Sequence, residues 1–147
     1  MPLDLPDAIS ELVARANEAF GQDLRGVILY KSWARGDATP SSDIDVMIVL
    51  DPRVPLNMQL YEGWEEREWR VDTHVLDVHF AHIPDGEKLP SGLWAEIALD
   101  GKVVYESELV VTRTLVTMRR RIAAGELGRR SSHGQPYWAE GSNKRNI

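Results

Sequence analysis

Two aspartates, Asp43 and Asp45, stand at the entrance of an apolar segment and are the residues best suited to carry chemistry. From Ile44 to Leu50 the chain alternates as a strand does, so Asp43 and Asp45 fall on the same face. Two neighbouring carboxylates repel each other unless a cation or a proton lies between them. Magnesium is commonly held by one or two carboxylates together with substrate phosphates. The pair therefore predicts a metal and phosphate site.

A third aspartate, Asp77, is expected on the same surface. Residues 71–80 also alternate as a strand. If both strands bury their even-numbered residues against the same helices, Asp43, Asp45 and Asp77 project together from the opposite, open face. Of the histidines near Asp77, only His79 shares its face, and we expect a structural or solvent-exposed role for it. The apolar residues of this second strand lie at even positions: Leu76, Val78 and Phe80.

The turn before Asp43 contains groups that can hold phosphates. Ser32 and the backbone N–H groups beside it are expected at the start of a helix, where they would hold a triphosphate. Arg35 either contacts a phosphate or braces the loop by pairing with Asp37, and Lys31 could lend a positive charge to a phosphate. An Asp-x-Asp pair alone is common on exposed strands. The spacing from Ser32, the apolar strand that follows and the later Asp77 together favour a metal site.

These residues resemble the Gly-Ser-x10-Asp-x-Asp signature of the nucleotidyltransferase superfamily with a DNA polymerase β-like palm. Ser32 is followed by ten residues and then by Asp43-x-Asp45, as the signature requires. The surrounding sequence, with Arg35-Gly36 as one of its most specific parts, looks like the small prokaryotic branch, the minimal nucleotidyltransferase (MNT) domains.

The resemblance covers about residues 25–105 and departs from the family at Lys31, which stands where the signature has glycine. A glycine lets the backbone approach a triphosphate closely, and a side chain at that position tends to obstruct the approach.

The resemblance implies a role for each of these residues. Asp43 and Asp45 would bridge metal ions, and Asp77, which matches the family's third aspartate, would complete a second metal site or accept the proton of the attacking hydroxyl. The implied catalytic and metal-binding residues are Asp43, Asp45 and Asp77, and the implied nucleotide-binding residues are Lys31, Ser32, Arg35 and Gly36.

The resemblance also implies an activity and a partner. It suggests a Mg²⁺-dependent enzyme that moves AMP from ATP to a hydroxyl group. Stand-alone domains of this size are often paired with a HEPN-type helical ribonuclease and act as its antitoxin, some by AMPylation of a tyrosine on the toxin. We therefore expect a nucleotidyltransferase of the MNT/HEPN toxin–antitoxin type.

Two other functions remain open. Lys31 in place of the signature glycine favours a catalytically impaired binding protein that keeps the fold and occludes a partner. A transferase that modifies a small molecule, such as an antibiotic, is the third alternative, although such enzymes usually carry a further helical domain for the acceptor. A homodimer could supply that pocket.

The periodicity predicts an α/β (α+β) fold, with a small mixed sheet that carries helices on one face and resembles the nucleotidyltransferase palm. Its order is α-β-β-α-β-α-β-α. Helices are expected at about residues 9–20, 57–69, 92–99 and 107–124, and strands at about 25–30, 43–50, 71–80 and 102–105.

Length and charge bound the remaining possibilities. The 147 residues suit one nucleotidyltransferase domain, residues 1–128, followed by a basic, flexible tail, residues 129–147. The net charge of −6 argues against general nucleic-acid binding. The tail contributes +3, which leaves −9 for the domain. There is no cysteine, and no apolar run approaches the ~20 residues that span a bilayer. We expect a cytoplasmic location.

Overall fold

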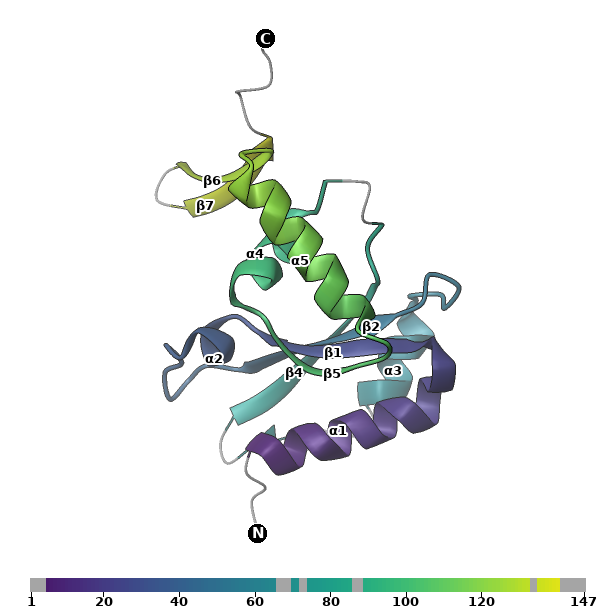
Figure 1. The fold of residues 1–147 in the computed structure, drawn as a ribbon. Helices are drawn as coiled ribbons and strands as arrows, with labels where there is room; N and C mark the ends of the chain where they lie inside the picture. The colour runs from purple at the N-terminus through teal and green to yellow at the C-terminus, as the bar shows by residue number, and fades with distance from the viewer. Residues whose placement is uncertain (1–4, 66–69, 72–73, 86–88, 133–134, 141–147) are drawn as a thin grey trace.

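The computed structural model describes residues 5–65, 70–71, 74–85, 89–132 and 135–140. At its centre lies a five-stranded mixed sheet in the order β3-β4-β2-β1-β5 (Figure 1). The strands are β1 (Leu24–Tyr30), β2 (Ile44–Leu50), β3 (Arg70–Val71), β4 (His74–His82) and β5 (Lys102–Glu106). The helices are α1 (Leu5–Phe20), the 3₁₀ helix η1 (Gly21–Asp23), α2 (Ser32–Arg35), α3 (Met58–Glu65), α4 (Gly92–Asp100) and α5 (Val110–Ala123).

The pairing of the strands confirms a mixed sheet. β1 runs antiparallel to both β2 and β5, and β3 runs antiparallel to β4. β2 and β4 are parallel and keep one unbroken register from Ile44↔Leu76 to Leu50↔His82. Parallel neighbours need a crossover connection, and here the chain between them includes α3 and β3.

One face of the sheet is covered by α1 and α3. The apolar spacing of α1 buries Leu12 and Ala16 against the even-numbered residues of β2, as the sequence predicted. At the far end of α1, the ring of Phe20 stacks on Trp64 of α3, with 6.3 Å between the ring centroids. The alternation of the strands therefore predicts this core correctly, with the even-numbered residues of β2 buried against α1.

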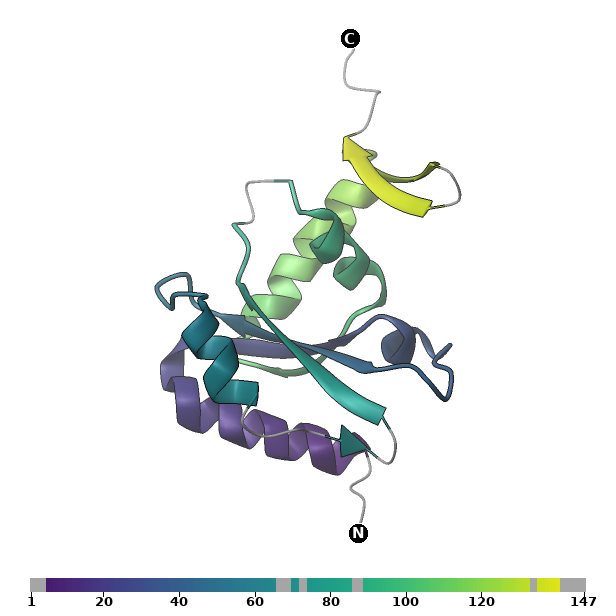
Figure 2. The same ribbon diagram turned by 180° about the vertical axis from the view of Figure 1, so that it is seen from behind.

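The other face is covered by α4 and α5, so the expectation of helices on one face only is wrong (Figures 1 and 2). Met47 and Val49 of β2 are fully buried against this second layer, which includes Ile97 of α4 and Leu115 of α5. The physical reason lies in β2 itself, which is apolar at every position after Asp45. Such a continuous run indicates a strand buried on both faces. The pocket that Asp45 and Asp77 line lies near the N-terminal ends of β2 and β4.

Residues 127–132 and 135–140 pair as the two strands of a hairpin, in place of the flexible tail expected from residue 129 onward. β6 (Leu127–Ser132) pairs antiparallel with β7 (Gln135–Glu140), and Leu127 is buried. Two side chains of the hairpin have a partner on α4, since Arg129 and Trp138 each donate a hydrogen bond to Glu96. Residues 141–147 lie outside the described residues.

Smaller differences concern where elements begin and end. The strand expected at 71–80 is divided into β3 and β4, and α3 ends at Glu65, with 66–69 outside the described residues. Ser91 caps α4 as its sequence suggests, because its hydroxyl accepts a hydrogen bond from the Trp94 N–H. α5 begins only at Val110, since Leu109 before it has a φ of 59°.

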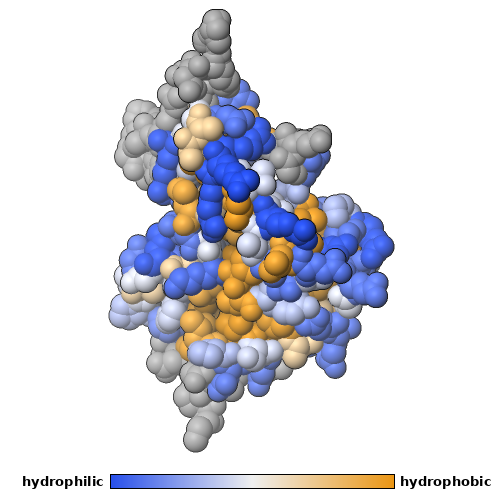
Figure 3. All heavy atoms as spheres, viewed as in Figure 1, coloured by the Kyte–Doolittle hydropathy of each residue, from blue (hydrophilic) through white to orange (hydrophobic). Residues whose placement is uncertain are grey.

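The edge strand β5 carries the most apolar part of the surface seen in Figure 3, between α5 and α1. Val104 on β5 and Leu109 beside it are exposed. Within the described residues, no helix combines the length and the apolar character that crossing a membrane requires.

Candidate active site

The parallel register of β2 and β4 brings Asp45 directly opposite Asp77. One carboxylate oxygen of each and one ring nitrogen of His79 all lie within 4.8 Å of one another. Asp43 is exposed, immediately precedes β2 and lines the same pocket. The structure therefore brings the three expected aspartates together and adds His79, whose Nε2 lies 3.1 Å from Oδ2 of Asp77.

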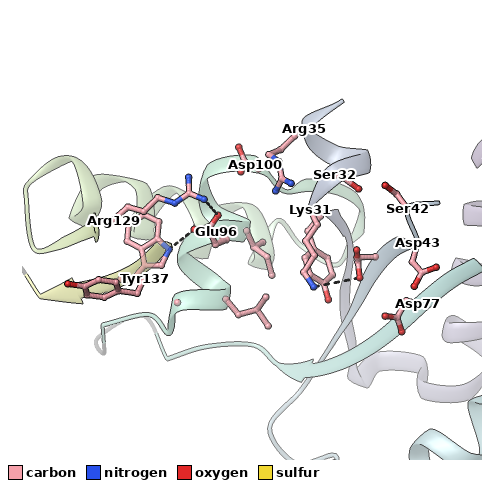
Figure 4. Close-up of a pocket in the computed structure, with 16 residues that line it drawn as sticks. Lys31, Ser32, Arg35, Ser42, Asp43, Asp77, Glu96, Asp100, Arg129 and Tyr137 are labelled. Atoms are coloured by element: carbon pink, nitrogen blue, oxygen red, sulfur yellow. Dashed lines mark hydrogen bonds and ion pairs between the residues drawn. The ribbon is translucent and has the colours of Figure 1, made fainter. Parts of the chain in front are cut away.

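These aspartates lie at one end of a single pocket of about 870 Å³ (Figure 4). We call this the carboxylate end, defined by Asp43, Asp45 and Asp77. The other end, the hairpin end, is defined by Arg129, Tyr137 and Trp138, and α4 lies between the two. A volume of this size is typical of pockets for small molecules and cofactors.

Asp45 is the most constrained of the carboxylates. It is 8% exposed, and it is the only buried charged residue among those that the structure describes. Burial raises its pKa above the ordinary value; the nearby ammonium of Lys31 opposes this rise, and the carboxylate of Asp77 adds to it. A buried carboxylate with another carboxylate beside it favours a bound cation.

Tyr30 lies next to this group because β1 pairs it with Asp45. Its side chain is 3% exposed, and burial, followed by the charges of Asp45 and Asp77, raises the pKa of its hydroxyl well above the ordinary value. The phenol therefore stays neutral, and Tyr30 lines the pocket beside Asp45 and Asp77.

Lys31 occupies the position of the signature glycine and retains a glycine-like backbone. Its φ is 60° and its ψ is −143°, a region that L-residues rarely adopt and that costs on the order of 1–3 kcal/mol. Its Nζ lies 3.8 Å from Oδ1 of Asp45, and the side chain is 54% exposed. The ammonium thus reaches the carboxylates from the solvent side.

The turn after Lys31 folds as expected. Ser32 begins α2 and lines the pocket, and Arg35 both lines the pocket and braces the loop, with its Nε 3.1 Å from Oδ2 of Asp37. Gly36 ends α2 with a φ of 84° and donates its N–H to the carbonyl of Ser32. Gly36 does not line the pocket, so its position supports a conformational role in the turn.

The loop that carries Asp43 is held from β4. The Nδ1 of His74 lies 2.8 Å from the carbonyl oxygen of Ser42, and the His74 ring meets Trp33 edge-on at 4.9 Å between centroids. Trp33 packs against His74 and against the core between the sheet and α1, and it does not line the pocket.

The contribution of α4 and the hairpin to the pocket was not predicted from the sequence. The pocket is also lined by residues that follow the signature in the sequence: Glu96, Arg129, Tyr137 and Trp138. The only local signal was the aromatic pair Tyr137-Trp138 within a polar segment. His79 was placed on the correct face by its alternation with Asp77, but its role beside the carboxylates was not anticipated.

The donor set of the carboxylate end fits a hard divalent cation. Carboxylate oxygens are the ligands that Mg²⁺ prefers, and phosphate oxygens of a substrate can complete its shell. Asp43, Asp45 and Asp77 could hold such an ion, with His79 as a further neighbour of Asp77.

Comparison with solved structures found several that are similar to this chain. A putative nucleotidyltransferase from Sulfolobus solfataricus is 23% identical over 69% of this chain and 80% of its own, with a TM-score of 0.47. A toxin–antitoxin structure with AMP-PNP is 15% identical over 78% of this chain and 89% of its own, with a TM-score of 0.43. A complex of tri-AMPylated Shewanella oneidensis HEPN toxin with MNT antitoxin is also 15% identical, over 80% and 87%, with a TM-score of 0.39.

A search of the curated proteins found no match to this chain. The model of the nucleotidyltransferase domain family matches residues 9–105, which include the signature turn, the three aspartates and the whole of the five-stranded sheet apart from the last residue of β5. Since this match spans more than half of the sequence, the chain belongs to the nucleotidyltransferase domain family.

Proposed function

We propose that this protein transfers AMP from Mg-ATP to a hydroxyl group of a protein partner and acts as the antitoxin of a HEPN-type ribonuclease. The proposed enzymatic activity is supported by one observation: a single pocket is lined by Asp43, Asp45, Asp77 and Ser32. The choice of a HEPN-type ribonuclease as the partner is based on the resemblance of the signature to that of minimal nucleotidyltransferases.

The proposed reaction is an in-line displacement at the α-phosphorus of ATP. The acceptor oxygen forms a bond to that phosphorus, the bond from phosphorus to the bridging oxygen of the β-phosphate breaks, and pyrophosphate leaves. A bound Mg²⁺ would neutralise charge on the attacking and leaving oxygens.

The residues of the pocket would have separate roles in this reaction. Asp43 and Asp45 would hold the cation, and Ser32 with the first N–H groups of α2 would bind the phosphates. Asp77 either completes the metal site or accepts the proton of the acceptor hydroxyl. In the second role, His79 at 3.1 Å from Asp77 offers a route for that proton to solvent, because its side chain is 42% exposed.

Calorimetric titration of ATP, with and without Mg²⁺, tests the proposal on the full chain. We expect binding that requires Mg²⁺ and is lost in Asp43→Asn, whereas Asp7→Asn, which changes an exposed aspartate of α1, should bind like the wild type. Transfer is then measured as radioactivity moved from α-labelled ATP to a co-purified partner. Absence of ATP binding in every condition would sink the enzymatic proposal for this chain.

A second candidate is a binding protein that keeps the fold without the chemistry. It is favoured by Lys31, whose ammonium already lies 3.8 Å from Asp45 and whose side chain replaces the signature glycine. Titration of the partner separates the two functions: a pure binder retains its effect in Asp43→Asn, and an enzyme loses it.

A further inference from the structure

We infer that the β6–β7 hairpin forms the site for the base of the nucleotide, with the indole of Trp138 as the surface on which the base stacks. This inference rests on the proposed function, since it assigns the second half of the pocket in which the phosphates would bind. The hairpin lies beyond residues 9–105, which the family match covers.

The hairpin is attached to α4 through one carboxylate. Oε1 of Glu96 accepts a hydrogen bond from Arg129 at 2.9 Å, and Oε2 accepts one from Nε1 of Trp138 at 2.7 Å. Arg129 and Trp138 are directly opposite each other in the β6–β7 register, so both side chains leave the hairpin on the same side. The orientation of the indole is therefore set before any ligand arrives, which reduces the entropy lost on binding.

Trp138 shares its pocket with the carboxylates. The same cavity of about 870 Å³ extends from Asp43 and Asp77 to Arg129 and Tyr137, with α4 between them (Figure 4). The base of a nucleotide is joined covalently to its phosphates. When the phosphates occupy the carboxylate end, the rest of the molecule has the hairpin end of this cavity open to it.

The chemistry of the hairpin end suits a planar, uncharged ring system. Leu93, which is 42% exposed, and the indole of Trp138 provide apolar surface there. The carboxylate of Glu96 and the guanidinium of Arg129 lie 2.9 Å apart, so their charges offset each other at this end of the pocket. An aromatic side chain can stack on any base, because every base has a π-face.

Two variants of Trp138 and two ligands test the inference. Trp138→Leu keeps apolar bulk and removes the aromatic face, and Trp138→Phe is the matched control that keeps an aromatic ring without the N–H donor. The ligands are ATP and inorganic tripolyphosphate, each titrated in the calorimeter with Mg²⁺ in excess. Circular dichroism checks that both variants are folded.

We expect Trp138→Leu to weaken ATP binding about tenfold, Trp138→Phe to weaken it less, and both to bind tripolyphosphate as the wild type does. Unchanged ATP affinity in Trp138→Leu would overturn the inference and leave the proposed function standing. An equal loss for ATP and tripolyphosphate would also overturn it, because the effect would then come from the fold. If the wild type binds tripolyphosphate but no ATP, both the inference and the proposed function fail.

Discussion

The ammonium of Lys31 lies 3.8 Å from Oδ1 of Asp45, and so a positive charge of the protein stands beside the most buried carboxylate of the site. The backbone that presents this ammonium has a φ of 60°, which a glycine would adopt at little cost. The chain therefore combines a glycine-like conformation with a cation at the place where a metal ion is expected. Two predictions separate the effect of the charge from that of the backbone.

The first prediction concerns the charge. Lys31→Met and Lys31→Gly both remove the ammonium, so we expect each to raise the affinity for Mn²⁺ severalfold in the absence of nucleotide, since a competing cation is gone. The affinity is measured by calorimetry or from the electron paramagnetic resonance signal of free Mn²⁺. A lower affinity in both variants would mean that Lys31 assists the metal, for example by positioning Asp45.

The second prediction concerns the backbone. Lys31→Gly relieves the positive φ, whereas Lys31→Met retains a Cβ in the same conformation. We expect Lys31→Gly to be more stable than Lys31→Met by about 1 kcal/mol in urea unfolding. Equal stabilities would show that the turn holds this conformation without strain.

The third prediction concerns Asp45. Burying its charge costs free energy that only a cation or a proton offsets, so Asp45→Asn is expected to raise the free energy of unfolding at pH 7 by on the order of 1 kcal/mol. The same variant should lose metal binding. Thermal unfolding without divalent ions provides the measurement, and a lower melting temperature would contradict the prediction.

The fourth prediction is a pH dependence that arises at the far end of β2. Asp51 accepts hydrogen bonds from Arg25 at 2.7 Å and from the N–H of Arg53, and these contacts lower the pKa of its carboxyl. A depressed folded pKa gives stability that is present above the unfolded pKa of about 4 and is lost as the pH falls through the folded value. Asp51→Asn should therefore be less stable at pH 7 and should lose less stability on acidification below pH ~4. Urea unfolding at several pH values measures this, and parallel curves for the two proteins would refute it.

The fifth prediction concerns the attachment of the hairpin. Glu96→Ala removes the acceptor of both Arg129 and Trp138, so local opening of β6 and β7 should become easier by about 1 kcal/mol. Hydrogen exchange of the amides in 127–140 should then be about fivefold faster, while exchange in β1 and β2 stays unchanged. Glu18→Ala on α1 is the control, because Glu18 is exposed and belongs to a different layer. Exchange at the wild-type rate in 127–140 would show that other contacts hold the hairpin.

Much of the carboxylate end could be predicted because its signals are local. The alternation of two strands predicted that Asp43, Asp45 and Asp77 share one surface. In the structure Asp45 pairs with Asp77 across the parallel strands, and all three aspartates line one pocket. Ser32 at the start of α2 and the pairing of Arg35 with Asp37 also follow from neighbouring residues. Their roles in catalysis and binding stay predictions.

The remaining features depend on contacts between distant parts of the chain. The second layer of helices was not predicted, because the alternation of the strands assigned the face of Asp43, Asp45 and Asp77 to solvent. Met47 and Val49 share that face of β2 and are apolar, and a strand that is apolar at both odd and even positions indicates burial on both faces. The hairpin was missed because its partner, Glu96, lies 33 residues before Arg129 and 42 before Trp138. No short window of sequence contains both halves of that contact.

The unbroken parallel register of β2 and β4 has a consequence for how this chain can vary in evolution. The two strands are joined by a long connection, and the cost of closing a loop rises only slowly with its length, so insertions there should be tolerated. A single deletion inside β4 before Asp77 is different, because it would move this carboxylate to the face of α1 and place an apolar residue opposite Asp45. Insertions and deletions in related sequences should therefore occur between the two strands and not within them.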